Sequence, residues 1–203
     1  MTLRTAARNA ALVVIGVAPA FPLAAQPGKI RTHAVELTIA GGYFTPTGPS
    51  GLAGGIELTP RPAWAATLHL DFNAKNGLMS VEFSTGLSPE RLRQVTSGAA
   101  AIRRTHVKYG AAKIMFGRNP RKNGISFLVG GGLSVINRMK SVTDAAKSST
   151  DFGGSAGAML RFPIDGQVGL RLDVEDLIYK ADYGRGSKLR NDLVWTAGLS
   201  IAW

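Results

Sequence analysis

Eight segments of this chain alternate apolar residues with small or polar ones, and this pattern constrains the possible folds more than any other feature. A period of two places successive side chains on opposite faces of a strand, whereas a helix repeats about every 3.6 residues. Clusters of glycine, proline and asparagine separate the segments, as expected for turns. The segments lie at residues 34–44, 63–72, 78–87, 105–116, 125–137, 151–162, 167–179 and 191–203. The sequence therefore predicts an all-β chain.

The segment at 191–203 shows the alternation most clearly. One of its faces carries Thr196 and Ser200. The other face is apolar and carries Leu193, Trp195, Ala197, Leu199, Ile201 and Trp203. Most segments are long enough to cross a membrane as tilted strands, which takes roughly 9–11 residues each. An even number of such strands closes without a free edge. We therefore expect an eight-stranded antiparallel up-and-down transmembrane β-barrel.

The same alternation would fit a soluble, lipocalin-type barrel with its faces inverted. The volume of the side chains favours the membrane form. The polar faces are built mainly from glycine, alanine, serine and threonine, while the apolar faces hold all three tryptophans. An eight-stranded barrel has a lumen just wide enough for side chains to fill. Small residues suit that lumen, and bulky apolar residues suit lipid.

The connections between the predicted strands alternate in length. Those at 45–62, 88–104, 138–150 and 180–190 are long, and those at 73–77, 117–124 and 163–166 are short. Long extracellular loops and short periplasmic turns are typical of outer-membrane barrels. This topology predicts an extracellular aromatic belt of Tyr43, Trp64, Phe152 and Tyr179. A periplasmic belt is predicted from Phe72, Phe116, Phe127, Phe162 and Trp203.

The first 25 residues have the pattern of a secretory signal peptide. Arg4 and Arg8 precede a short apolar run, and Leu23, Ala24 and Ala25 offer a cleavage site. We therefore expect a cleaved signal peptide at 1–25 and one barrel domain at 26–203. The chain contains no cysteine, which excludes disulfides and thiolate metal sites.

The leader, the eight strands and the terminal alternation ending in Trp203 resemble the small outer-membrane β-barrel proteins of the OmpA, OmpX and OmpW kind. The resemblance implies a porin-like protein of the Gram-negative cell envelope, without an added periplasmic domain. It also implies that the alternating positions from Leu193 to Trp203 form the signal read by the barrel-assembly machinery. Periplasmic chaperones and outer-membrane lipid are the other expected partners.

Several charged residues fall on faces that should point into the lumen. They are Glu36, His69, Asp71, Glu82, Lys113, Arg161, Arg171, Asp173 and Glu175. Buried charges require partners, so we expect salt-bridged pairs that plug the barrel. A narrow channel for small solutes is the alternative.

A lipid-modifying enzyme is a further alternative. The chain has three histidines, His33, His69 and His106. His69 and Asp71 occupy adjacent inward positions and could form half of a catalytic triad, but no serine is placed to complete it. We therefore predict no catalytic residue, no cofactor and no metal site.

The chain is basic, with a net charge of +11. The long connections and adjoining strand ends hold twelve basic residues, including Arg61, Arg91, Arg103 and Arg104, against four acidic ones. Arginine binds phosphate through two parallel hydrogen bonds. Contact with lipopolysaccharide phosphates is therefore one hypothesis, and an ordinary solvated loop surface is the other. Nucleic acid is not an expected partner of an exported barrel.

Overall fold

A computed structural model describes residues 34–46, 51–53, 56–75, 77–89, 91–96, 99–104, 106–118, 124–139, 149–165, 167–182 and 187–203. The expected signal peptide at 1–25 and His33 lie outside these residues. No helix within the described residues is long and apolar enough to cross a membrane.

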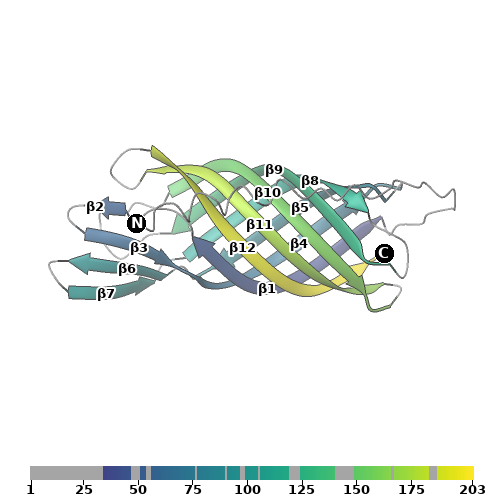
Figure 1. The fold of residues 1–203 in the computed structure, drawn as a ribbon, viewed down its shortest axis with the longest axis horizontal. Coiled ribbons are helices and arrows are strands. Elements are labelled where there is room, and N and C mark those ends of the chain that lie inside the picture. Colours follow the sequence, from purple (N-terminus) through teal and green to yellow (C-terminus); the bar gives the residue numbers. More distant parts are fainter. Residues whose placement is uncertain are drawn as a thin grey trace, which may run out of the picture.

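Eight long strands form a closed antiparallel barrel, as the alternation predicts (Figure 1). In chain order they are β1 (Val35–Pro46), β4 (Ala63–Asn73), β5 (Met79–Ser88), β8 (His106–Arg118), β9 (Ser126–Met139), β10 (Ser149–Pro163), β11 (Val168–Asp182) and β12 (Ser187–Ala202). Around the barrel the order is β1-β12-β11-β10-β9-β8-β5-β4, and β4 pairs with β1 to close it. The turn between β4 and β5 uses Gly77 at a φ of 66°, a conformation that suits glycine.

Four short strands among the described residues pair into a second sheet. They are β2 (Gly51–Ala53), β3 (Ile56–Arg61), β6 (Arg91–Thr96) and β7 (Ala99–Arg104), in the order β2-β3-β6-β7. Figure 1 shows this sheet beyond one end of the barrel, opposite the end that carries the C-terminus. We call the end of the barrel next to the small sheet the sheet end, and the end that carries the C-terminus the turn end. The sequence suggested pairing only within 51–58, so the extent of the sheet is a finding of the structure.

Most barrel strands are longer than the sequence indicated, and the gain is largest in β10, β11 and β12. β10 begins at Ser149, and the β11–β12 pair continues to the partners Asp182 and Ser187. Their pairing extends past the point at which the apolar alternation fades, because backbone hydrogen bonds need no apolar face. These strands lengthen the wall at the sheet end.

The register of the barrel sets how its strands cross the interior. Successive directly opposed residues, followed once around the barrel from Glu36, lead back to β1 at Pro46. Such an offset requires strongly tilted strands, typically about 35–45° from the barrel axis. In the strand order, β5 and β11 are separated by three strands on either side. They therefore form opposite walls of a narrow lumen.

The outer wall carries the bulky apolar residues, as the volume argument predicts. Ile39, Leu133 and Phe152 are exposed, and Thr196 and Ser200 are buried on the inner face. The residues predicted for the two aromatic belts follow the same rule, with one exception. Tyr179 does not face outward but lies inside the barrel at 1% exposure. The inward alternation of β11 through Glu175 continues to this residue.

Candidate functional site: the barrel interior

The guanidinium of Arg171 lies at the centre of a buried ionic cluster. Arg171 projects inward from β11 and is fully buried. Its Nη2 donates to Glu82 Oε2 at 2.7 Å, and its Nε donates to both oxygens of Asp173 at 2.9 Å. Its Nη1 donates to Asp71 on β4. One side chain thus joins its own strand to the opposite wall of the barrel.

Lys113 on β8 makes a second connection across the lumen. Its Nζ lies 2.8 Å from Glu82 Oε1 and 3.0 Å from Glu175 Oε1. Ser84 on β5 donates its hydroxyl to Glu175 at 3.3 Å. These contacts join β5, β8 and β11 on the sheet-end side of Arg171. The carboxylates of the cluster therefore have charged partners, as buried ions require.

A separate ion pair lies nearer the turn end. Arg161 on β10 places its Nε 3.0 Å from Glu36 Oε1 on β1, and the same nitrogen donates to Ser200 Oγ at 3.1 Å. Gly169 leaves the space that this guanidinium fills, since a Cβ at that position would lie 2.8 Å from Arg161 Nε. All nine charged or titratable residues that the sequence assigns to the lumen, Lys113 included, are buried in the structure.

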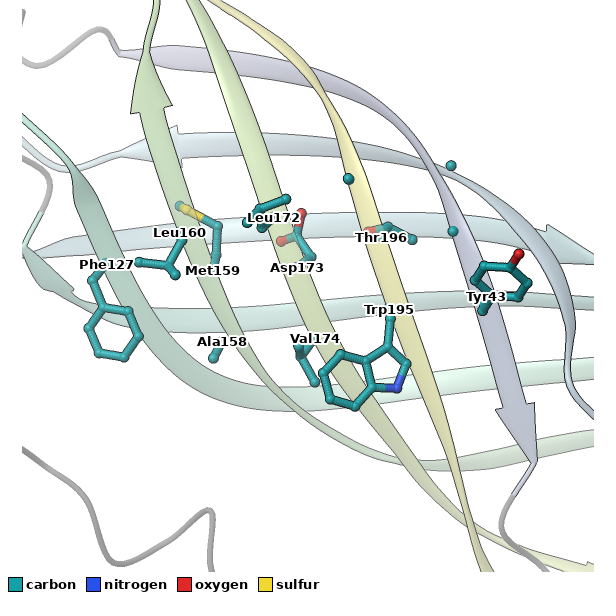
Figure 2. Close-up of a pocket in the computed structure, with 13 residues that line it drawn as sticks. Tyr43, Phe127, Ala158, Met159, Leu160, Leu172, Asp173, Val174, Trp195 and Thr196 are labelled. Atoms are coloured by element: carbon teal, nitrogen blue, oxygen red, sulfur yellow. The ribbon is translucent and has the colours of Figure 1, made fainter.

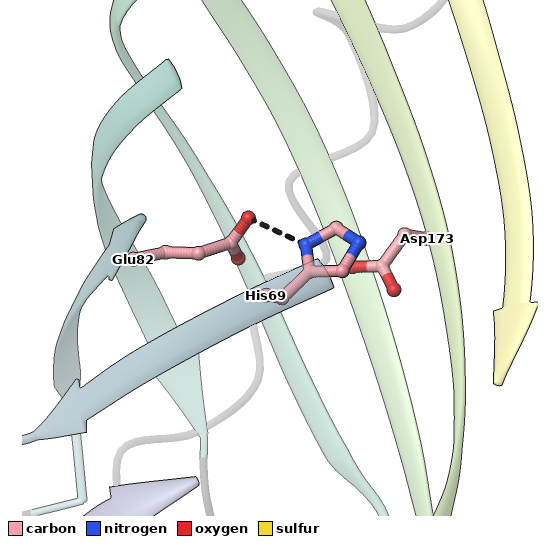
Figure 3. A group of neighbouring side chains, drawn as sticks. All are labelled: His69, Glu82 and Asp173. Carbon is pink, nitrogen blue, oxygen red and sulfur yellow. Dashed lines mark hydrogen bonds and ion pairs between the residues drawn. The ribbon is translucent and has the colours of Figure 1, made fainter. Parts of the chain in front are cut away.

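His69 has different partners from those that the sequence suggested. Its Nδ1 lies 3.1 Å from Glu82 Oε1, and its Nε2 lies 3.1 Å from Thr67 Oγ1 (Figure 3 shows His69 and Glu82). The acid beside the imidazole is Glu82, not Asp71. A hydroxyl, an imidazole and a carboxylate in this order have the connectivity of a hydrolytic triad. All three side chains are buried, however, and Glu82 also binds Lys113 and Arg171. A lipid ester cannot reach the Thr67 hydroxyl there.

His69, Glu82 and Asp173 have one ligand atom each within 4.8 Å of one another, a spacing that could suit a metal ion (Figure 3). The residues around them do not fit such an ion. Both oxygens of Glu82 and both oxygens of Asp173 already accept hydrogen bonds or ion pairs from Arg171, Lys113 or His69. A cation would have to displace the guanidinium that holds this position. We therefore assign the cluster to charge pairing.

An apolar layer fills the lumen nearer the sheet end. It comprises Phe44, Ala65, Val107, Tyr109, Ile136, Leu177, Tyr179, Ala181 and Val194, all buried. The rings of Phe44 on β1 and Tyr109 on β8 lie 6.4 Å apart, although β4 and β5 separate these two strands by the shorter way around the barrel. The sequence does not predict this layer if inward positions are expected to be small or polar. The alternation itself indicates it, since Leu177 and Tyr179 continue the inward face of β11.

Another ionic contact lies beside the apolar layer, at the same level of the barrel. Arg138 on β9 donates to the hydroxyl of Tyr179, and its Nη2 lies 2.6 Å from Asp192 Oδ2 on β12. The Tyr179 hydroxyl donates to the same oxygen of Asp192 at 2.5 Å. The guanidinium also lies 5.0 Å from the Tyr179 ring centroid, within the range of a cation–π contact.

The outer wall has an apolar hollow of about 570 Å³ across β10, β11, β12 and β1 (Figure 2). Small residues, including Gly41, Ala158 and Ala197, form part of it, beside the larger Tyr43 and Trp195. Trp195 and Tyr43 are exposed on the outer face. The hollow is therefore a feature of the lipid-facing surface and does not belong to the charged interior.

Solved structures with the same fold are outer-membrane barrels. The outer membrane protein OprG from Pseudomonas aeruginosa has a TM-score of 0.64 at 9% identity, over 87% of this chain and 99% of that one. The N-terminal barrel domain of Pseudomonas aeruginosa OprF has a TM-score of 0.56 at 10% identity, over 85% and 100%. Neisserial surface protein A has a TM-score of 0.55 at 9% identity, over 85% and 99%. No family model matches the chain, and no curated protein matches it in sequence. These likenesses show the fold of the small outer-membrane β-barrels.

Proposed function

From the fold of a small outer-membrane β-barrel, we propose that this protein is a closed, non-conducting barrel with a structural or surface-interaction role. The observation that carries the proposal is the pair of contacts that Arg171 and Lys113 make across the lumen. On this proposal the protein is exported, and the barrel-assembly machinery inserts it into the outer membrane.

The ionic cluster supports closure because its members meet in the middle of the lumen. Arg171 reaches Glu82 on the opposite wall, and Lys113 joins Glu82 to Glu175. Glu82 and Arg171 are both inaccessible to solvent. Opening a path for ions would break these buried ion pairs, and a buried charge left without its partner costs several kcal/mol.

The apolar layer supports closure at a second level. Phe44, Val107 and Ile136 are all fully buried within the barrel. Hydrated ions and polar solutes lose their hydrogen bonds to water in such a layer and gain none from it. A narrow channel for small solutes would need both levels to open together, so it is the weaker of the two functions.

A closed barrel can act only through what it presents outside its lumen. The apolar outer wall is suited to lipid, and the sheet end carries the small sheet and the long β11–β12 pair. A rigid membrane anchor that displays these elements accounts for the charge pairing of the interior without a substrate path. We therefore place the interaction surface at the sheet end.

A solute-flux assay tests the proposal. Protein refolded into liposomes should give no faster efflux of small solutes than empty liposomes, while an open porin in the same lipid gives rapid efflux. Heat-modifiable gel migration shows that the protein is folded in each preparation. Efflux well above the empty liposomes, from folded protein, would favour the narrow channel instead.

A further inference from the structure

Three arginines of the small sheet occupy directly opposed positions on adjacent strands. Arg61 on β3 pairs with Arg91 on β6, and Arg91 pairs with Arg104 on β7. Directly opposed positions belong to the same face of a sheet, and neighbouring strands lie about 4.8 Å apart. We call Arg61, Arg91 and Arg104 the arginine row.

The arginine row lies where the small sheet joins the barrel. Arg61 ends β3 just before β4 begins at Ala63, and Arg104 ends β7 just before β8 begins at His106. Arg91 begins β6 shortly after β5 ends at Ser88. All three positions therefore lie at the base of the sheet, next to the rim of the barrel (Figure 1).

Trp64 on β4 and Tyr43 on β1 mark the adjoining level of the outer wall. They are directly opposed near the sheet ends of their strands, and both are exposed. Exposed tryptophan and tyrosine gather at the membrane–water interface of such barrels. Arg61 precedes Trp64 by three residues, a distance of about 10 Å along an extended strand. The arginine row thus falls at the level of the lipid headgroups.

The register of the small sheet sets like charges beside one another in the row. Like charges at directly opposed positions of a sheet destabilise the pairing. Arg93 alternates with Arg91 and adds a fourth positive charge to the same face. Among the described positions of that face, the acidic one is Glu57, which pairs with Val95 two rows away. An anion bound beside the row would offset the repulsion.

We propose that the arginine row binds the phosphate groups of lipid headgroups in the leaflet that surrounds the sheet end. This inference rests on the proposed location of the barrel in a membrane and names the partner of its interaction surface. Arginine suits phosphate because its planar guanidinium can donate two parallel hydrogen bonds to it. The level of the row favours a lipid-borne phosphate over a free one, because phosphate is held there at high local concentration.

Neighbouring residues of one strand provide a matched pair of variants. Arg103 and Arg104 are adjacent on β7, so alternation assigns them to opposite faces, and Arg103 pairs with Leu92 rather than with an arginine. Arg104→Gln and Arg103→Gln therefore remove the same charge from the same strand. Arg61→Gln, Arg91→Gln and Arg104→Gln combined remove the whole row.

Binding is measured on the full barrel in detergent micelles, using native mass spectrometry with bisphosphorylated lipid A, dephosphorylated lipid A and inorganic phosphate as separate probes. We expect the affinity for bisphosphorylated lipid A to fall by about tenfold or more in the triple variant, because charge-assisted hydrogen bonds are removed. Arg104→Gln should weaken binding more than Arg103→Gln. Heat-modifiable migration must show that each variant is folded.

Equal binding of bisphosphorylated lipid A by the wild-type protein and the folded triple variant would overturn the proposal. The proposal would also be overturned if the wild-type protein bound dephosphorylated lipid A as tightly as bisphosphorylated lipid A. The acyl chains alone would then explain the affinity. Displacement of the lipid by equimolar inorganic phosphate would overturn the lipid assignment. None of these results depends on conductance, so they are distinguishable from a failure of the closed-barrel proposal.

Discussion

Arg171 and Glu82 lie on opposite walls of the barrel, and their side chains meet with Nη2 2.7 Å from Oε2. The two residues are 89 positions apart in the chain, and neither is accessible to solvent. The same guanidinium also binds Asp71 and Asp173. The contact between Arg171 and Glu82 therefore braces two opposite walls of the barrel, and under the proposed function it also blocks the lumen.

Arg171→Met should destabilise the barrel strongly, because it leaves Asp71, Glu82 and Asp173 buried without their main cation. Removing one partner of a buried ion pair costs about 3–5 kcal/mol. The free energy of unfolding in urea, measured for barrels refolded into lipid, checks this value. Arg118→Met is the matched control, since Arg118 is exposed at the turn end of β8. Similar losses in the two variants would show that the cross-lumen contacts contribute little.

Gly86→Ala should disturb the apolar layer. Gly86 pairs directly with Tyr109, and a Cβ at this glycine would lie 2.3 Å from Tyr109 Cζ. The ring must move within a packed interior, and such overpacking typically costs about 1–3 kcal/mol. Gly41→Ala is the control, because a Cβ there would meet its nearest neighbour, the Ala65 carbonyl oxygen, at an ordinary 3.9 Å. The urea midpoints should fall for Gly86→Ala only, and equal midpoints in the two variants would contradict the packing of Tyr109 over Gly86.

The contribution of Asp165, in the turn between β10 and β11, to the stability of the barrel should depend on pH. The backbone N–H groups of Val168 and Gln167 each donate to Asp165 Oδ1 at 2.7 Å, and these bonds lower the pKa of the carboxyl below its usual range. A lowered pKa contributes stability that is present above the unfolded-state value and is lost as the pH falls through the folded-state value. The stability difference between the wild-type protein and Asp165→Ala should therefore be largest above about pH 4 and shrink below it. A difference that stays constant down to pH 2 would contradict this role.

The terminal alternation predicts an effect on assembly. Trp203 ends the chain at the seam of the barrel, where its N–H donates to the Val35 carbonyl oxygen at 3.0 Å. If the terminal pattern is the assembly signal, Trp203→Ala should lower the amount of folded barrel in outer membranes but not the yield of refolding in detergent. Trp64→Ala is the control, since Trp64 is similarly exposed, at 53% against 55%. Equal losses of membrane-inserted barrel from both variants would argue against a special role for the terminus.

Strand number, closure and facing follow from the sequence because they depend on a local period of two. In β11, for example, Leu170, Leu172 and Val174 alternate with Arg171 and Asp173. This short stretch of sequence is enough to assign the two faces of the strand. The charged interior follows in the same way. The prediction for Tyr179 was wrong because an aromatic residue at a strand end was assigned to the interface, although the alternation of β11 places it inside.

Partner choice inside the lumen does not follow from a local pattern. His69 and Asp71 are adjacent inward positions, yet the imidazole binds Glu82 and the carboxylate binds Arg171. These choices depend on the offset of the register around the whole barrel and on which strands face each other across it. The small sheet is missed for a related reason, since its short strands pair between two separate connections.

The central claim is that the lumen is closed by Arg171, Lys113 and the apolar layer, and single-channel recording tests it most directly. Folded wild-type protein in a planar bilayer should give no stable conductance steps, under conditions in which an open porin gives regular ones. Reproducible, long-lived steps from the folded wild-type protein would mean that ions pass the level of Arg171 and Glu82. That result would contradict a closed lumen.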